Sequence, residues 1–246
     1  MRYLILSDIH ANVDAFEAAL EHASGRWDRA LVLGDLVGYG AEPNAIVEAV
    51  RAMRPDAVIR GNHDKAACGL DDGSQFNHVA RIAAIWTGAQ LTPENYEYLR
   101  ALPMGPLEVD SLTQICHGAP FDEDHYIFEG NDAVMALQSA DRPLCLYGHT
   151  HLPAIFRKVD DAFEGEAPDP DRETVLPLQR GVRYLVNAGS IGQPRDGDPR
   201  AGYGVLDDEA RELRLYRVAY PVEKAQQRIL AAGLPASLAN RLAFGR

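Results

Sequence analysis

Cysteine, basic residues and long apolar runs are all scarce in this sequence of 246 residues. The three cysteines, Cys68, Cys116 and Cys145, are widely separated and form no C-x-x-C motif. Their spacing argues against a thiolate zinc site and favours reduced, buried thiols. No segment approaches the roughly 18 apolar residues of a membrane span, and Asp8 interrupts the N-terminal apolar run. We therefore expect a soluble cytoplasmic protein with no membrane partner.

The shortage of positive charge bears on the partners of the protein. Lysine and arginine total 24 against 36 acidic residues, which gives a formal net charge of −12. A duplex-binding protein ordinarily carries a basic patch that displaces counterions from phosphates, and this sequence has no dense basic run. The balance disfavours nucleic acid as a partner. A small phosphorylated substrate is still compatible with this composition, because bound metal ions would add positive charge that the formal net charge does not include.

The first sixty residues alternate between two kinds of apolar pattern. Short apolar runs at 3–6, 30–33 and 57–59 are typical of buried strands, whereas 12–23 and 43–53 have apolar residues at helical spacing. This βαβαβ rhythm predicts parallel strands joined by helical crossovers.

The rest of the chain continues this mixture of strands and helices. We predict helices at 75–90, 93–101, 131–140, 221–230 and 234–244. We predict strands at 107–109, 112–116, 144–147, 184–186, 203–206 and 213–218. The acidic segment Asp160–Asp171, with two prolines, is expected to be a surface loop.

Five of the eight histidines lie in short clusters with Asp, Asn or Gly, and the clusters follow predicted strands. The loops after parallel strands form the ligand crevice of an open α/β sheet, so these clusters are expected to converge. Nitrogen and oxygen ligands without sulfur suit manganese, iron, zinc, nickel or cobalt. The clusters are Asp8-x-His10, Gly34-Asp35, Gly61-Asn62-His63-Asp64, Cys116-His117-Gly118 and Gly148-His149-x-His151.

The spacing inside two clusters suggests how they bind. Alternate residues of an extended segment point the same way, so Asp8 and His10 are expected to share one ion, and His149 and His151 one extended face. Taken singly, each cluster has a simpler explanation; Asp8, for example, could merely cap a helix. Five such clusters in succession favour a metal site.

The order of these clusters resembles the calcineurin-like metallophosphoesterases, over residues 1 to about 220. The segments Gly34–Gly40 and Asn187–Arg195 are similar to a bacterial and archaeal branch of phosphodiesterase-like members. The resemblance implies an α/β fold, a four-layer sandwich of two mixed β-sheets packed together and flanked by helices. It implies a single domain over residues 1–246, with C-terminal helices at about 221–246.

The resemblance also implies two divalent metal ions, with manganese expected and iron, zinc, nickel or cobalt as alternatives. A hydroxide shared by both ions would attack the phosphorus. The carboxylate of Asp35 would bridge the ions. One ion would be held by Asp8, His10, Asp35 and His151. The other would be held by Asp35, Asn62, His117 and His149.

Further residues receive roles in catalysis from the same resemblance. His63 would be the general acid, and Asp64 would orient it and keep its pKa high enough to hold a proton. Asn62, His63 and Arg195 are the candidate contacts to the substrate phosphate. For Arg195, a loop arginine that lies in solvent or pairs with Asp196 is an equal alternative.

The implied function is a phosphodiesterase or phosphomonoesterase that acts on a small soluble ester. A phosphoprotein Ser/Thr phosphatase is the alternative, but Gly38 and Tyr39 stand where that branch has Asp and Arg. A non-catalytic metal-binding scaffold is a further alternative, disfavoured because no ligand position has been lost. The loops 66–75 and 120–130 are expected to set selectivity. A homo-oligomer is left open, as are the substrate and the metal.

Overall fold

The computed structural model describes residues 1–160 and 162–246. The eight helices of the described residues are α1 Val13–His22, α2 Pro43–Met53, α3 Asn62–Ala67, α4 His78–Gln90, α5 Pro93–Ala101, α6 Gly130–Ser139, α7 Val222–Ala231 and α8 Ala236–Leu242. The strands there are β1 Arg2–Leu6, β2 Arg29–Val32, β3 Ala57–Val58, β4 Leu107–Glu108, β5 Thr113–Ile115, β6 Leu144–Tyr147, β7 Ala154–Val159, β8 Ala162–Glu166, β9 Thr174–Pro177, β10 Arg183–Asn187, β11 Ala201–Asp207 and β12 Glu212–Val218.

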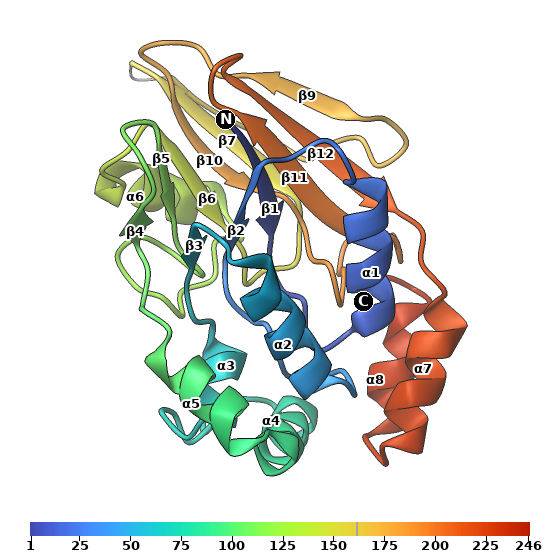
Figure 1. Cartoon of the computed structure of the whole chain (residues 1–246). Coiled ribbons are helices and arrows are strands. Elements are labelled where there is room, and N and C mark those ends of the chain that lie inside the picture. The colour runs from blue at the N-terminus through green and yellow to red at the C-terminus, as the bar shows by residue number, and fades with distance from the viewer. Residues whose placement is uncertain (161) are drawn as a thin grey trace.

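Two six-stranded mixed sheets form the centre of the molecule (Figure 1). The first has the order β3-β2-β1-β11-β12-β9, and the second β4-β5-β6-β10-β7-β8. Each contains three neighbouring parallel strands, β1–β3 in the first and β5, β6 and β10 in the second. The predicted parallel βαβαβ start is therefore confirmed. The loops after the parallel strands form the crevice edge of such sheets.

Alternation along the strands divides the apolar side chains between separate cores. In β1, Leu4 and Leu6 join the core under the helices α1 and α2, whereas Tyr3 and Ile5 pack between the two sheets. Successive strand residues point to opposite faces, so one strand serves both cores. Helix α6, through Leu137 and its neighbours, covers the outer face of the second sheet. The layers run helices, sheet, sheet, helix, which confirms the predicted four-layer sandwich.

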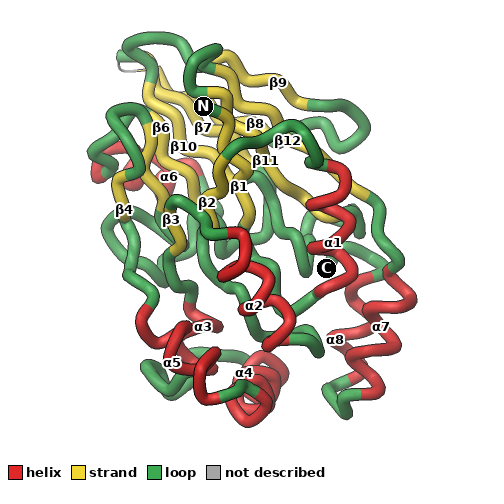
Figure 2. The backbone as a smooth tube through the Cα atoms, in the orientation of Figure 1, coloured by secondary structure: helices red, strands yellow, loops and turns green. Residues whose placement is uncertain are grey.

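The two C-terminal helices pack on the body of the molecule. Helix α7 lies against α1 and α8, as Figure 2 shows for the red segments beside the C-terminus. Arg228 of α7 donates to Asp14 of α1 at 3.0 Å and to Glu42 at 2.7 Å, and Lys224 lies 2.7 Å from the same Asp14. The Asp14 side chain is only 1% exposed, so these cations neutralise a charge that burial would otherwise penalise. No helix of the described residues has the length and apolarity needed to cross a bilayer.

The predicted surface loop at Asp160–Asp171 is wrong in part. Strand β8 occupies residues 162–166 and pairs antiparallel with β7, whereas residue 161 lies outside the described part of the chain. Strand β8 is an edge strand with mostly exposed side chains, so it lacks the alternation of apolar and polar residues that marks a half-buried strand. Strands β7 and β9 also lack a clear alternation of buried and exposed residues, and the sequence pattern did not predict them.

Candidate metal centre

The candidate ligands converge at one edge of the two sheets. They come from the segments that follow five strands: Asp8 and His10 after β1, Asp35 after β2, Asn62 after β3, His117 after β5, and His149 and His151 after β6. All of them are buried except Asn62, which is partly exposed. Asn62 opens the short helix α3, which the sequence pattern did not predict. The expected convergence of the clusters is confirmed.

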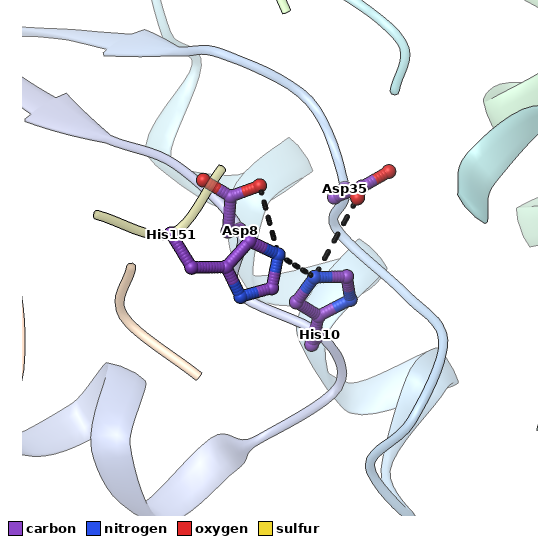
Figure 3. A group of neighbouring side chains, drawn as sticks. All are labelled: Asp8, His10, Asp35 and His151. Carbon is purple, nitrogen blue, oxygen red and sulfur yellow. Dashed lines mark hydrogen bonds and ion pairs between the residues drawn. The ribbon is translucent and has the colours of Figure 1, made fainter. Parts of the chain in front are cut away.

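The first ligand group consists of Asp8, His10, Asp35 and His151, whose candidate ligand atoms all lie within 4.8 Å of one another. Figure 3 shows these four side chains turned toward a common centre. The Nε2 atoms of His10 and His151 are 3.1 Å apart. His10 Nε2 lies 3.5 Å from Asp35 Oδ2, and His151 Nε2 lies 3.5 Å from Asp8 Oδ1.

The second ligand group consists of Asp35, His117 and His149, and Asn62 adjoins it. His117 Nε2 lies 3.4 Å from Asp35 Oδ2, 3.3 Å from Asn62 Oδ1 and 3.1 Å from His149 Nδ1. The same oxygen of Asp35 therefore faces both groups. This position is the one required of a carboxylate that bridges two cations.

One nitrogen of each histidine ring in the two groups faces a backbone carbonyl. A carbonyl only accepts hydrogen bonds, so a neutral ring carries its hydrogen on that nitrogen and presents a lone pair toward the centre. The four pairs are His10 Nδ1 with Val37 O at 3.0 Å, His117 Nδ1 with Leu33 O at 2.8 Å, His149 Nε2 with Asp124 O at 3.0 Å and His151 Nδ1 with Gln193 O at 2.6 Å.

This arrangement leaves acceptor atoms without donors. The facing Nε2 atoms of His10 and His151 are both acceptors when neutral, and they would repel each other. Within the described residues, the buried Asp8 Oδ2 and Asp35 Oδ2 also have no hydrogen-bond partner. Unpaired buried acceptors are costly, and divalent cations coordinated by these nitrogen and oxygen atoms would satisfy them. The residues present therefore fit a metal centre.

Burial and mutual charge set the protonation of the site. Burial lowers the pKa of His10, His149 and His151 well below the ordinary value, which keeps these rings neutral, as metal ligands must be. Burial also raises the pKa of Asp8 to about 6. For His117, burial acts downward, but the carboxylate of Asp35 raises its pKa to about 10. In the protein alone, the proton on the His117 ring therefore faces the carboxylate of Asp35, and a bound cation would replace that proton.

Five of the seven candidate ligands have left-handed backbone conformations. Their φ angles are between 50° and 67°, at Asp8, His10, Asp35, His149 and His151. Residues other than glycine avoid this region at a cost of about 1–2 kcal/mol each, and such strain clusters at functional sites. The predicted extended geometry at 8–10 and 149–151 is therefore wrong. In the turn that forms instead, His149 joins the second group and His151 the first.

A close packing of backbone against ligands positions these turns. A side chain on Gly148 would overlap Ser7 and lie 2.8 Å from Asp8 Oδ2. The next amide, His149 N–H, donates to Asp8 Oδ1 at 3.0 Å. Asn187 Nδ2 donates to the carbonyl of Gly148 at 2.9 Å and fixes the same turn. Asn187 could not be identified as a positioning residue from the sequence, because Asn187 is distant in sequence from the histidines that it supports.

The structure corrects the expected role of Asp64. Its carboxylate accepts from the amides of Val37 at 3.1 Å and Gly61 at 3.0 Å, whereas no hydrogen bond joins it to His63 among the described residues. Asp64 therefore ties the loop after β2 to the start of α3. Burial lowers the pKa of the His63 ring to about 4, and this effect outweighs the opposite effect of the Asp35 carboxylate. The expectation that Asp64 keeps the pKa of His63 high enough to hold a proton is therefore wrong for the protein alone.

Aromatic rings surround His63 beside the first ligand group. Its ring stacks on Phe76 with centroids 4.5 Å apart, and it lies 4.3 Å from the ring of Tyr39 and 5.0 Å from that of His10. The backbone amide of His63 donates to Asp35 Oδ1 at 2.9 Å. His63 is therefore fixed next to the ligands by packing and by its own main chain. Phe76 adjoins the selectivity loop predicted at 66–75, although the sequence did not single it out.

Arg195 lies beside the first group. Its guanidinium donates to Tyr39 Oη at 3.3 Å and to Gln193 Oε1 at 3.1 Å. The alternative pairing with Asp196 is not formed, because Asp196 is the partner of Arg217. No carboxylate among the described residues pairs with Arg195 within 4.0 Å, so its charge is available to an anion.

A charged cluster holds the loop that follows β5 against α3. Arg60 forms a two-pronged pair with Glu123, at 3.1 and 3.0 Å, and Lys65 binds Glu123 at 3.0 Å and Asp124 at 2.6 Å. Asp124 is the residue whose carbonyl faces His149. Arg60 therefore belongs to a cluster that fixes the partner of a candidate ligand.

Comparison with known proteins gives concordant results. The family model described as the calcineurin-like phosphoesterase superfamily domain matches residues 1–211. An uncharacterised protein of Methanocaldococcus jannaschii is 32% identical over 245 residues, which cover 98% of this chain and 97% of that protein.

Solved structures repeat the fold. A metallophosphoesterase from Sphaerobacter thermophilus is 40% identical, with a TM-score of 0.87 and coverage of 100% of this chain and 99% of that one. A hypothetical protein from Pyrococcus horikoshii has a TM-score of 0.80 at 20% identity, covers 100% of this chain and 98% of its own, and shows the fold alone.

Proposed function

This chain belongs to the calcineurin-like phosphoesterase superfamily, and we propose that it is a metal-dependent hydrolase of small phosphate esters with a dinuclear centre. The observation that carries the proposal is the convergence of seven candidate ligands into two groups that share Asp35, with ring lone pairs directed inward by backbone carbonyls. Manganese is the metal we propose first; iron, zinc, nickel and cobalt share the same ligand preferences.

The proposed ligand sets follow the two groups. Asp8, His10, Asp35 and His151 would hold one ion, and Asp35, Asn62, His117 and His149 the other. When bound, two divalent cations would supply the charge that activates water and neutralises the phosphoryl oxygens. The turns at the strand ends keep these donors in place before any ligand arrives, so little reorganisation is needed.

We assign proton transfer to His63. In hydrolysis an oxygen of water bonds to phosphorus, the bond to the leaving alcohol breaks, and the alcohol oxygen needs a proton. The ring of His63 has a low pKa in the protein alone, and the negative charge of a bound phosphate would raise it. A protonated His63 would then donate to the leaving group. Arg195 and Asn62 are proposed to contact the phosphate oxygens.

Two features support a small ester over a phosphoprotein. Tyr39, rather than an arginine, packs against His63, and it holds Arg195 at the rim of the site through its hydroxyl. The formal net charge of −12 disfavours docking of an acidic phosphoprotein. The proposal treats residues 1–246 as one domain, which the packing of α7 on α1 supports.

The test is hydrolysis of p-nitrophenyl phosphate, bis-p-nitrophenyl phosphate and an alkyl phosphate by chelator-treated protein to which each metal is returned. Metal-dependent turnover is expected, and the diester-to-monoester ratio gives the substrate class. His63→Ala is expected to lower kcat for the alkyl ester by about 10²–10⁴-fold. The loss should be smaller for p-nitrophenyl esters, whose good leaving group hardly needs a proton.

Two results would contradict the proposal. Absence of turnover with every metal and ester, in protein shown to bind two ions, would favour the non-catalytic scaffold. An equal loss for alkyl and nitrophenyl esters in His63→Ala would remove the general-acid role of His63 while leaving the hydrolase itself intact.

A further inference from the structure

A stack of aromatic rings leads away from the second ligand group. The ring of Tyr126 lies flat on His149, with centroids 3.7 Å apart and an interplanar angle of 23°. Phe128 stacks in turn on Tyr126, at 5.1 Å and 5°. The two rings are far from hidden, since Tyr126 is 39% and Phe128 58% exposed. Neither ring is a candidate metal ligand or takes part in the proposed proton transfer.

The stack ends at an open cavity of about 530 Å³. The residues that line the cavity include Ile127, Phe128, Leu152, Phe156 and Phe163. Thr150, which lies between the candidate ligands His149 and His151, also borders it. The volume lies in the range of small-molecule pockets, about 300–1,000 Å³. The cavity and the metal centre therefore adjoin the same turn and are joined by the aromatic stack.

The loop that carries the stack is held in place. Ile127, between the two exposed rings, is buried in the core under α6. The carboxylate of Asp132 accepts from the amides of Phe128 at 3.2 Å and Glu129 at 3.1 Å, and Lys65 fixes Asp124 at the other end. Exposed aromatic rings on an anchored loop form a preorganised surface, which lowers the entropy cost of binding.

We propose that the Tyr126–Phe128 stack and the adjoining cavity bind a planar aromatic group of the substrate, such as a nucleobase, while its phosphate lies at the metal centre. This proposal rests on the proposed hydrolase function and specifies its substrate class. His149 and Phe128 cover the two faces of Tyr126, so the face that the stack offers to a ligand is the outer face of Phe128, which borders the cavity. A flat, polarisable group suits such a face because stacking contacts are made over the whole ring.

The test compares adenosine 5′-monophosphate with ribose 5-phosphate. The two share the same reacting primary phosphate and differ in the base. In the metal-loaded enzyme we expect the nucleotide to have a KM about tenfold lower or better, in line with the contribution of one stacked base. Phe128→Leu keeps an apolar side chain but removes the flat face, and Tyr126→Leu removes the ring on which Phe128 packs. Each should reduce the ratio between the two substrates several-fold.

Phe121→Leu is the matched control. Phe121 lies in the same loop and is 40% exposed, but its ring packs on His125 and makes no ring contact with Tyr126 or Phe128 in the described part of the chain. It should leave the ratio unchanged. Turnover of ribose 5-phosphate should be similar in Phe128→Leu and Phe121→Leu, which separates loss of stacking from damage to the metal centre.

The outcomes are separable from those of the proposed function. Equal KM values for nucleotide and sugar phosphate, or an unchanged ratio in both leucine variants, would overturn the stacking proposal while hydrolysis persists. A shift to a smaller species on size exclusion in Phe128→Leu would also overturn it, because the rings would then be a contact between copies. If neither ester is hydrolysed, the hydrolase proposal fails, and calorimetric titration with the two compounds still decides whether the base is bound.

Discussion

The first and second ligand groups share Asp35 but are supported by different parts of the molecule. In the first group the partners of His10 and His151 are carbonyls of turns packed in the interior, and Ser190 Oγ and Gly192 N–H both donate to the carbonyl of Asp8, at 2.8 and 2.9 Å. In the second group Asn62 is partly exposed, and His149 depends on the carbonyl of Asp124, whose own side chain is 48% exposed.

This difference teaches how one centre can be both rigid and open to ligand. Buried turns with satisfied main-chain bonds hold the first group at fixed geometry. The second group relies on a surface loop that also carries Tyr126, so its ligand geometry is linked to the wall that we propose for the substrate. We therefore expect the first group to bind its ion more tightly and the second to respond more to changes in the loop.

Asp35→Asn should give the largest effect, because it alters both groups at once. Loss of the shared negative charge should lower kcat by at least about 10²–10³-fold, the cost of removing one strong electrostatic contact at a reacting centre. The bound metal should fall from two ions to one or none, measured by elemental analysis after dialysis. Retention of two ions with full activity would show that this carboxylate does not join the groups.

Glu123→Gln should weaken only the second group. Without its charge, Arg60 and Lys65 hold the loop less firmly and the Asp124 carbonyl moves away from His149. Loss of such an outer partner costs about 10–100-fold in metal affinity. In a calorimetric metal titration, only the weaker of the two binding steps should change. The control Glu17→Gln removes the same charge from an exposed position on α1. Equal weakening of both phases would contradict the division between the two groups.

Metal binding to the unaltered protein should raise Tm in two unequal steps. An ion at a hundred times its Kd stabilises by about 2.7 kcal/mol, and 1 kcal/mol shifts Tm by roughly 2–4 °C for a chain of this length. We therefore expect a rise of roughly 5–10 °C from the tighter site, at a metal concentration too low to fill the other. Differential scanning calorimetry at graded free metal would test this. A single step would indicate equivalent groups.

Arg228→Met should have the smallest effect on either group and serves as the remote reference. It leaves the buried Asp14 with Lys224 as its nearest cation, and an imperfectly paired buried group costs about 1–3 kcal/mol. The urea midpoint should fall accordingly, whereas both metal affinities should stay unchanged. Arg180→Ala, at an exposed position, is the matched control. A change in metal affinity would show that the C-terminal helices act on the centre.

Several features of the site could be predicted from the sequence because their cause is local. The clusters at residues 8–10, 34–35 and 61–64 follow short apolar runs, and parallel strands bring such segments to one edge. The role of Asp64 was not predicted correctly, because the family resemblance implied a contact with His63, whereas its carboxylate accepts from the amides of Val37 and Gly61. Asn187 and Asp124 were not identified, because their contacts to the histidine turns are long-range.

By itself, the sequence determined the alternation of strands and helices, the family and the kinds of donor atoms at the centre, since these follow from residue type and spacing along the chain. Only the tertiary structure decided which ring nitrogen faces inward, which turns are left-handed, and that a stacked pair of exposed rings lies between His149 and a cavity. Those features depend on carbonyls and side chains contributed by distant segments. Their geometry exists only once the two sheets have packed together.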